Sequence, residues 1–477
     1  MDEHKIISNK ELNIWEALIP VIALIGMLAF NMFYLGDDAG AYNNQLILLI
    51  SAAVALVMGF FNKVSFRHMV KGIKSNLKSV FVPIFILLLV GALSASWLLS
   101  GIIPAMIYYG IKLINPDVFL PSAIVIASIV SLATGSSWTT SATIGVALIA
   151  IGRAIGLPAG MVAGAVISGA YFGDKMSPLS DTTNLAAAMA GTKLFTHIKY
   201  MLYTTAPSII ITILVFLVLS FTKESQIISG TEDLLIAVTE KFVISPWLFL
   251  VPLAVVVLII KKANPIVALS VGVVLGLITS HFFQPQLLAE VSNKWSFLLN
   301  STYNGIGLSA SNVQLQGLLE AKGILGMFGT ILLIICAMIF GGIMDSIGAL
   351  ARISQALLSI ATSIFGLFAS TVASCLALNI TASDQYLAIV VPGKMFEKAY
   401  QEKGLAPENL SRTLEDSGTV TSVLIPWNTC GAYQSATLGV GVGEYFAYAI
   451  FNYISPFMTL LFAAFKIKIA ELKPNKS

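Results

Sequence analysis

Long apolar runs, most of them close to the length of a membrane-spanning helix, recur along the chain and constrain its fold more than any other feature. They occupy residues 14–35, 45–61, 79–100, 200–221, 246–260, 264–281, 324–344 and 436–464. A helix needs about 20 apolar residues to cross the bilayer core. Only 11% of the residues are charged, against about 25% in soluble domains, so little polar sequence remains to cover a water-exposed surface. The sequence therefore predicts an all-α polytopic membrane protein rather than a soluble enzyme.

Basic residues gather in a few connecting segments and predict the side of the membrane that each one faces. Lys and Arg occur in segments 62–78, 191–199, 261–262, 393–413 and 466–476, which we expect to be cytoplasmic by the positive-inside rule. Segments 36–44 and 222–245 carry more acidic than basic residues and are expected outside. Both termini would then be cytoplasmic, in a multi-pass protein of the cell inner membrane. We expect ten crossings and two re-entrant hairpins.

The two halves of the chain resemble each other. "WEALIPVIAL" (15–24) is echoed by "WLFLVPLAVV" (247–256), and Ser-Gly followed by a proline-containing polar stretch occurs at 168–178 and again at 417–426. The charge distribution orients the two echoes oppositely, which predicts two inverted-topology repeats, as in many secondary transporters. Chance similarity between apolar segments is the alternative. If segments 101–115 and 347–360 also crossed, the repeat would be parallel.

"GAYFGDKMSPLSDTTNLA" (169–186) places two carboxylates and a lysine inside apolar sequence. Pro178 lacks a backbone donor and disfavours helix at Ser177, so we expect a broken helix there. Freed carbonyls and nearby hydroxyls form an oxygen-rich cluster that suits an alkali cation. Charged residues at membrane depth are functional-site candidates by default. The alternative is a cytoplasmic loop, in which Lys175 would be well solvated.

Three other polar stretches interrupt apolar sequence, at 132–143, 378–390 and 424–435. The first two are expected as tips of re-entrant hairpins and the third as a second broken helix. Together with the first break they would form a midplane ion site. Among the acidic candidates Asp181 ranks first because hydroxyl and amide side chains surround it, and Asp384 ranks second; Na⁺ would bind at these two with nearby hydroxyls and carbonyls. Asp174 ranks third, because Lys175 beside it indicates an edge or gating position. The polar candidates are Ser180, Thr182, Thr183, Asn184, Ser136, Ser137, Thr139, Asn379, Thr381, Ser383, Asn428 and Thr429.

Four stretches carry a resemblance to a known family: "TGSSWTT" (134–140), "SGAYFGDKMSPLSDTTNLA" (168–186), "SDQYLA" (383–388) and "EDSGTVTSVLIPWNTCGAY" (415–433). They resemble the NhaC-type sodium/proton antiporters. The resemblance implies exchange of cytoplasmic Na⁺ for external H⁺, although some relatives exchange malate for lactate. It also implies a scaffold (1–118 and 223–360) that could dimerise, and a mobile transport domain (119–222 and 361–477). No cofactor and no nucleic-acid partner is expected.

The chemistry of antiport needs one site that cannot hold both ions at once. A single carboxylate that binds either Na⁺ or H⁺ meets this need, because burial and a neighbouring carboxylate both favour its protonated form. An Na⁺- and H⁺-coupled exchanger of a small organic acid, or of another organic solute, is the alternative within transport. Enzymatic readings are weaker: "YFGD" (171–174) has Tyr171 where intramembrane aspartyl proteases need glycine, and no ATP-binding glycine loop is present. Glu415 and Asp416 are expected at a helix N-terminus, where the dipole favours negative charge.

Overall fold

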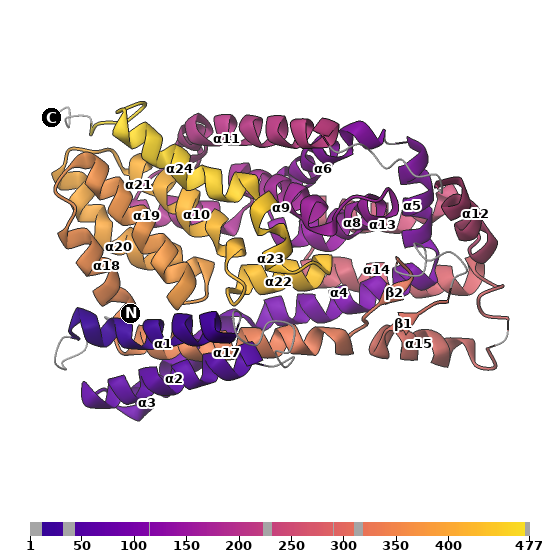
Figure 1. Ribbon diagram of the computed structural model, residues 1–477, viewed down its shortest axis with the longest axis horizontal. Helices are drawn as coiled ribbons and strands as arrows, with labels where there is room; N and C mark the ends of the chain where they lie inside the picture. Colours follow the sequence, from indigo (N-terminus) through magenta and orange to yellow (C-terminus); the bar gives the residue numbers. More distant parts are fainter. Residues whose placement is uncertain are drawn as a thin grey trace.

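The computed structural model describes residues 12–31, 43–113, 115–222, 231–289, 291–309 and 318–472, and these residues are almost all helical (Figure 1). The all-α class predicted from the sequence is confirmed. Strands in the described part are limited to β1 (Ile306–Gly307) and β2 (Glu320–Ala321), which pair antiparallel. Both chain ends, most of segment 36–44 and the first part of segment 222–245 lie outside the described residues, so their predicted sides of the membrane stay predictions.

Six helices are long and apolar enough to cross a membrane. They are α2 (Asn43–Phe61), α4 (Phe81–Leu99), α11 (Leu194–Thr222), α14 (Pro265–Phe283), α17 (Phe328–Ser346, extended by η6, Leu325–Met327) and α19 (Ile364–Thr381). The number rises to eight if each of two bent pairs forms one span. Ten crossings therefore remain a prediction, whereas a multi-pass membrane protein is well supported.

The two bent pairs fall in the regions of the apolar runs predicted at 246–260 and 436–464. One joins α12 (Thr231–Lys241) to η5 (Pro246–Phe249) and α13 (Leu250–Ile260), with an angle of 86°. The other replaces the single span predicted at 436–464: α23 (Val442–Tyr445) and η9 (Phe446–Tyr448) meet α24 (Ile450–Ala464) at 51°. Two segments whose crossing was left open, α5 (Ile102–Leu113) and α18 (Ala349–Ser359), have 12 and 11 residues. At ~1.5 Å per residue each is too short to cross alone.

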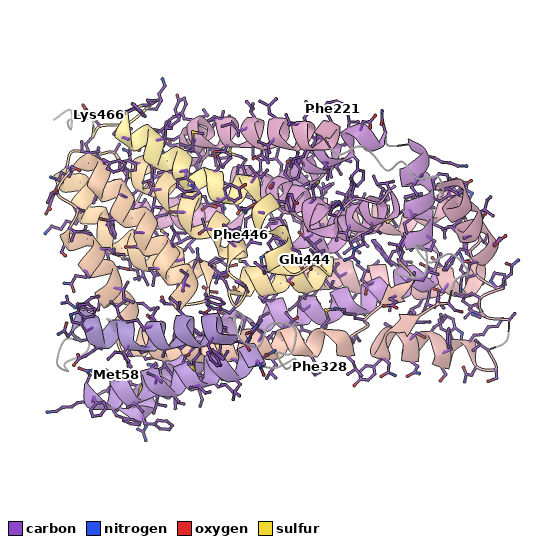
Figure 2. All side chains as sticks on the ribbon, viewed as in Figure 1. Met58, Phe221, Phe328, Glu444, Phe446 and Lys466 are labelled. Atoms are coloured by element: carbon purple, nitrogen blue, oxygen red, sulfur yellow. The ribbon has the colours of Figure 1, made fainter. Side chains whose placement is uncertain are left out.

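Large apolar side chains cover the outside of the molecule. Phe221 and Phe328, at opposite edges of the view in Figure 2, are 67% and 52% exposed. Similar side chains project from α1 (Ile14–Phe30), α2, α11 and α14, where Ile22, Leu46, Leu214 and Val274 are more than half exposed. A water-soluble monomer rarely exposes so much contiguous apolar surface, so this surface is suited to lipid.

One group of helices packs around α17 and α4. The basic amphipathic helix α3 (Phe66–Ser79) lies with α2 against α17, and buries Met69 while its lysines stay outside, whereas α1 packs on α2 and α18 (Figure 1). In the same group of helices, α4 packs on α14 and on α15 (Lys294–Asn304). Apolar side chains from α4, α5, α13, α14 and α17 form the largest buried core.

The second group contains the four polar stretches, and helices stop and restart at each of them. The first-half helices are η3 (Pro116–Val118), α6 (Phe119–Thr134), α7 (Ser137–Thr140), the π-helical η4 (Ser141–Gly145), α8 (Val146–Ala154), α9 (Ala159–Met176) and α10 (Asp181–Ala190). The second-half helices are α19, α20 (Gln385–Glu402), α21 (Pro407–Leu414), the π-helical η7 (Glu415–Thr419), η8 (Ser422–Leu424) and α22 (Thr429–Leu438). The interruptions fall at 135–136, 177–180, 382–384 and 425–428.

Close backbone contact holds this second group together. α6 and α9 share the most extensive helix–helix contact among the described elements, and glycines of α9 make it possible. A Cβ on Gly173 would lie 2.4 Å from the Ser128 carbonyl oxygen and 2.6 Å from the Leu132 nitrogen. The small residues therefore fix the position of Asp174, the residue that follows.

Candidate functional site

The first two interruptions touch each other. Gly135 ends α6 in the left-handed conformation, with φ of 69°. A Cβ there would lie 2.6 Å from the Leu179 Cβ and 2.9 Å from the Ser180 nitrogen, so the chain at 135 rests directly on the break between α9 and α10. Ser136 then caps the next helix by accepting a hydrogen bond from the Thr139 amide. The segment 169–186 is thus a packed, broken helix, and the alternative of a solvated loop is wrong.

Asp174 lies at the centre of this contact. Its Oδ2 accepts hydrogen bonds from the Ser137 amide (3.0 Å) and the Ser137 hydroxyl (2.8 Å). Its Oδ1 is buried and has no protein partner, and the residue is 6% exposed. A buried carboxylate oxygen without a donor is costly, so it is suited to bind a cation or a proton.

A cavity of about 310 Å³ opens beside Asp174. Asp181 also lines it and accepts a hydrogen bond of 2.5 Å from the Tyr386 hydroxyl of α20. The other described lining residues are Val82, Pro83, Ile86, Thr134, Gly135, Ser136, Trp138, Thr139, Leu179, Pro265 and Gln385. None of these carries a positive charge. The cavity therefore combines two carboxylates, hydroxyls and an amide, and electrostatically favours cations.

The cavity lies beside the first turns of two apolar helices that follow basic segments. It touches Val82 and Pro265, in the first turns of α4 and α14. α4 follows the lysine-rich α3, and α14 follows the Lys261–Lys262 turn. Both preceding segments carry the basic residues from which the sequence predicts cytoplasmic loops, and the side of the membrane that the cavity faces stays a prediction.

Behind the cavity, Lys175 forms a buried ion pair with Asp416, and both side chains are 0% exposed. Because Lys175 is buried and paired, it does not mark Asp174 as an edge or gating position in the way the sequence suggested. Asp416 also accepts hydrogen bonds from Thr204 of α11 (2.8 Å), from Ser455 of α24 (3.2 Å) and from Thr459. This one carboxylate thus joins α9, α11, η7 and α24.

Glu415, next to Asp416, is also fully buried. Its Oε1 accepts a 3.1 Å hydrogen bond from Thr182, whose hydroxyl contacts that of Ser180, and its Oε2 has no protein partner. The expected helix N-terminus at 415–416 is wrong, because α21 runs directly into η7 and the two residues lie within a continuous helical segment. Glu415 is therefore a third buried carboxylate near the interruption at 177–180, in addition to Asp174 and Asp416.

The second-half candidates form a separate polar cluster. Asn428 donates to the backbone and side-chain oxygens of Asn379 (3.0 and 3.2 Å), and Asn379 donates to the Gly418 carbonyl (2.8 Å) and to Thr421 (3.0 Å). The Ser383 carbonyl accepts from the Thr429 amide (3.0 Å), while the Ser383 hydroxyl has no partner. None of the five candidates Asn379, Thr381, Ser383, Asn428 and Thr429 lines the cavity beside Asp174 among its described residues.

Asp384 is not among the described residues that line the cavity beside Asp174, and its carboxylate caps the N-terminus of α20 instead. Its Oδ1 accepts hydrogen bonds from the amides of Tyr386 (2.9 Å) and Leu387 (3.0 Å), and the residue is 5% exposed. Its neighbour Tyr386 reaches Asp181. The structure thus brings Asp174 and Asp181 to one cavity and places Asp384 one residue away from its wall.

The other first-half candidates mainly hold the break in shape. Ser180 accepts a hydrogen bond from the Thr183 amide and caps α10. The Thr183 hydroxyl donates to the Lys175 carbonyl (3.1 Å), and Asn184 donates to the carbonyls of Pro178 and Ser180 (3.1 and 2.6 Å). Ser136 and Thr139 line the cavity, and Ser137 contacts it through Asp174.

Sequence reasoning missed several residues. Tyr386 and Gln385 line the cavity and lie within the quoted stretch "SDQYLA" (383–388), but they were not named as site candidates. Trp138, within the quoted stretch "TGSSWTT" (134–140), was not named as a site candidate; it lines the cavity and stacks on Tyr433 with ring centroids 4.1 Å apart. Glu415 and Asp416 did carry a signal, because they open the quoted stretch "EDSGTVTSVLIPWNTCGAY" (415–433). Within the described residues, no three His, Cys, Asp or Glu side chains gather as a site for a resident metal ion.

A helical membrane protein whose interrupted helices meet at a buried carboxylate beside a one-sided cavity has the organisation of a secondary transporter. The resemblance noted in the sequence is confirmed at the level of family, since residues 169–467 match the Na⁺/H⁺ antiporter family. The chain belongs to that family.

Curated relatives match along nearly their whole length. The chain is 39% identical to the Na⁺/H⁺ antiporter NhaC of Alkalihalophilus pseudofirmus, over 97% of this chain and 98% of the relative. It is 34% identical to the malate-2H⁺/Na⁺-lactate antiporter of Bacillus subtilis, over 89% and 88%. It is also 32% identical to the arginine/ornithine antiporter ArcD of Halobacterium salinarum, over 97% and 94%. All three are named as antiporters, which supports antiport over enzymatic activity.

Proposed function

We propose that this protein is a secondary antiporter that exchanges cytoplasmic Na⁺ for external H⁺. The observation that carries the proposal is the unpartnered Oδ1 of Asp174, buried at the wall of a cavity with two carboxylates and no described basic lining residue. This geometry offers a negative site to a small cation from the cytoplasmic side. Membership of the Na⁺/H⁺ antiporter family supports the same pair of ions.

The coupling follows from mutual exclusion at Asp174. Na⁺ and H⁺ bind the same carboxylate oxygens, so the occupied site carries one or the other. In both cases the carboxylate is neutralised and its unit can move, whereas an empty, charged site would pay a high desolvation cost. We therefore rank Asp174 first among the acidic candidates for the shared site, because it is buried, whereas Asp181 is exposed and hydrogen-bonded to Tyr386.

Asp181, Ser136 and Thr139 are the proposed additional Na⁺ ligands, since each lines the cavity with an oxygen. Na⁺ is a hard cation that takes such oxygen ligands. The polar cluster around Asn379 and Asn428 is proposed to support the second pair of interruptions rather than to bind the cation directly.

Alternating access would move 119–222 and 361–477 against a scaffold of 1–118 and 223–360, which could dimerise. Two of the buried cores support this division, although the largest core joins α4 and α14 to Ala147 of α8 and Tyr433 of α22. One core combines α6, α8 and α9 with α11 and α22–α24, and another combines α10 with α19–α21, so both lie within the proposed moving unit. A second cavity, of about 220 Å³, lies along the later part of α4 near Ser94 and Leu98, and Trp138, which lines the first cavity, stacks on Tyr433. The pair is therefore proposed to close the external path.

Exchange of an organic acid is the less favoured alternative. A relative named as a malate-2H⁺/Na⁺-lactate antiporter gives it a precedent. However, a carboxylate substrate would face Asp174 and Asp181, and the nearby cation Lys175 is already paired with Asp416. Two like charges at short range in a desolvated site repel each other strongly.

Reconstituted liposomes that contain a pH dye test the proposed exchange. Addition of Na⁺ alone should drive proton movement, and malate or lactate should not increase the initial rate. Proton movement that requires an organic acid would contradict the proposal.

Cysteine labelling tests the proposed inner-membrane topology with cytoplasmic termini. Single cysteines that replace Lys71 and Lys262 should react from the same, cytoplasmic side, and labelling from opposite sides would contradict this topology.

A further inference from the structure

We propose that the cavity beside Asp174 also binds small aliphatic amines, that is, mono- or diammonium cations that lack a carboxylate, in competition with Na⁺. This inference rests on the proposed function, because it uses the same carboxylate. It adds a class of organic ligand that a simple cation site does not require.

The size of the cavity is the first observation. A volume of about 310 Å³ far exceeds the space of one Na⁺ ion, and it lies at the lower end of the ~300–1,000 Å³ range of small-molecule sites. Its lining has a polar side and an apolar side. Asp174, Asp181 and Ser136 supply oxygens, whereas Val82, Pro83 and Ile86 of α4 supply an apolar wall. A short methylene chain with a charged end matches this division.

The second observation is the set of unsatisfied acceptors and aromatic rings. An ammonium group has three donors and could satisfy the buried Asp174 Oδ1, which has no protein partner. Trp138 and Tyr386 also line the cavity, and aromatic faces attract organic cations within about 6 Å of the ring centre. Asp181 provides a second carboxylate for the far end of a diamine.

The third observation concerns what the cavity lacks. Among its described lining residues there is no Lys, Arg or His side chain to receive a carboxylate. Lys175 is fully buried behind the wall and is paired with Asp416. An amino acid with the same cationic end therefore brings a carboxylate that meets only negative groups. The cavity should prefer an amine over the corresponding amino acid.

Competition measurements with matched probes test this preference. Uptake of radioactive Na⁺ into proteoliposomes is measured with putrescine or agmatine, and with ornithine or arginine, which add a carboxylate to the same cationic ends. Butanediol serves as the uncharged control, and protein-free liposomes correct for passive movement of amines. At a concentration equal to its dissociation constant, a competing amine should double the apparent KM for Na⁺ and leave the maximal rate unchanged.

The outcomes separate this inference from the proposed function. Na⁺ exchange that is insensitive to both amines, or equally sensitive to the amines and the amino acids, would overturn the inference and leave Na⁺/H⁺ antiport intact. Binding of putrescine to the purified protein without any Na⁺ exchange would instead overturn the proposed function.

A variant pair tests the location. Val82→Phe fills part of the apolar wall, so it should weaken amine competition more than it weakens Na⁺ uptake. Val125→Phe on α6 is the control: Val125 is exposed to a similar degree (44% against 49%) and does not line the cavity, so it should change neither. An unchanged ratio of amine to Na⁺ affinity in Val82→Phe, measured on protein that remains folded, would move the amine site elsewhere.

Discussion

The buried ion pair between Lys175 and Asp416 makes a quantitative prediction about stability. Lys175→Met leaves the Asp416 carboxylate without its counter-ion in a fully buried site, although Thr204, Ser455 and Thr459 still donate to it. Breaking a buried pair in this way typically costs about 3–5 kcal/mol, because an uncompensated charge remains. Asp416→Asn, which leaves the buried ammonium unpaired, should cost a similar amount.

The double variant decides whether charge is the cause. Lys175→Met combined with Asp416→Asn removes both charges and keeps an acceptor for the threonines, so it should lose at least about 2 kcal/mol less than the sum of the single variants. The surface pair Lys398–Glu402 is the matched control: its atoms are 3.7 Å apart and its side chains are 85% and 66% exposed. Lys398→Met should cost less than about 1 kcal/mol.

Equilibrium unfolding of the detergent-solubilised protein, followed by helical circular dichroism, measures these free energies. The reasoning is refuted if Lys175→Met is no more destabilising than Lys398→Met, or if the two single effects simply add. Either result would mean that the pair is not a buried charge–charge contact in the folded protein.

Two further predictions concern the geometry of the site. Gly135→Ala should abolish exchange and should lower the free energy of unfolding by about 1–3 kcal/mol more than Gly439→Ala does. Both residues have positive φ (69° and 64°), but only a Cβ at Gly135 would meet a neighbouring segment, at Leu179 and Ser180. Equal unfolding free energies of the two variants would argue against the contact between the two interruptions. Tyr386→Phe removes the hydroxyl donor to Asp181 and should change the apparent Na⁺ affinity by up to about tenfold. The reason is that one hydrogen bond to a charged group contributes ~1.5 kcal/mol. An unaltered KM for Na⁺ in the uptake assay would remove Asp181 from the cation site.

Much of the fold could be predicted from local sequence. Long apolar runs located α2, α4, α14 and α17, because lipid imposes length and composition on each crossing helix. Polar residues and proline inside apolar sequence located the helix interruptions, including that at 177–180, because unwound backbone at membrane depth must be satisfied inside the protein. The bend at 449, between η9 and α24, was not predicted, since residues 445–451 around it include no charge, glycine or proline and the bend depends on packing.

The composition of the site was less predictable than its position. Asp174 and Asp181 were recognised as candidates, but their order depended on burial, which distant helices determine. Lys175 was taken as a sign that Asp174 lies at an edge, because its partner Asp416 lies 241 positions away in the sequence. Tyr386 reaches Asp181 across 205 positions, and no local pattern reports such a contact. The inverted repeat, the division into two domains and the roles of the site residues stay predictions.

The pH dependence of Na⁺ affinity in Asp174→Asn and in the unaltered protein tests the central claim most directly. If Na⁺ and one proton compete for Asp174, the apparent KM for Na⁺ in proteoliposomes should rise as the pH falls, approaching tenfold per pH unit once the carboxylate is mainly protonated. Asp174→Asn should abolish Na⁺-driven proton movement in folded protein, whereas the exposed control Glu402→Gln should behave like the unaltered protein. Full exchange by Asp174→Asn with the usual pH dependence would contradict the account.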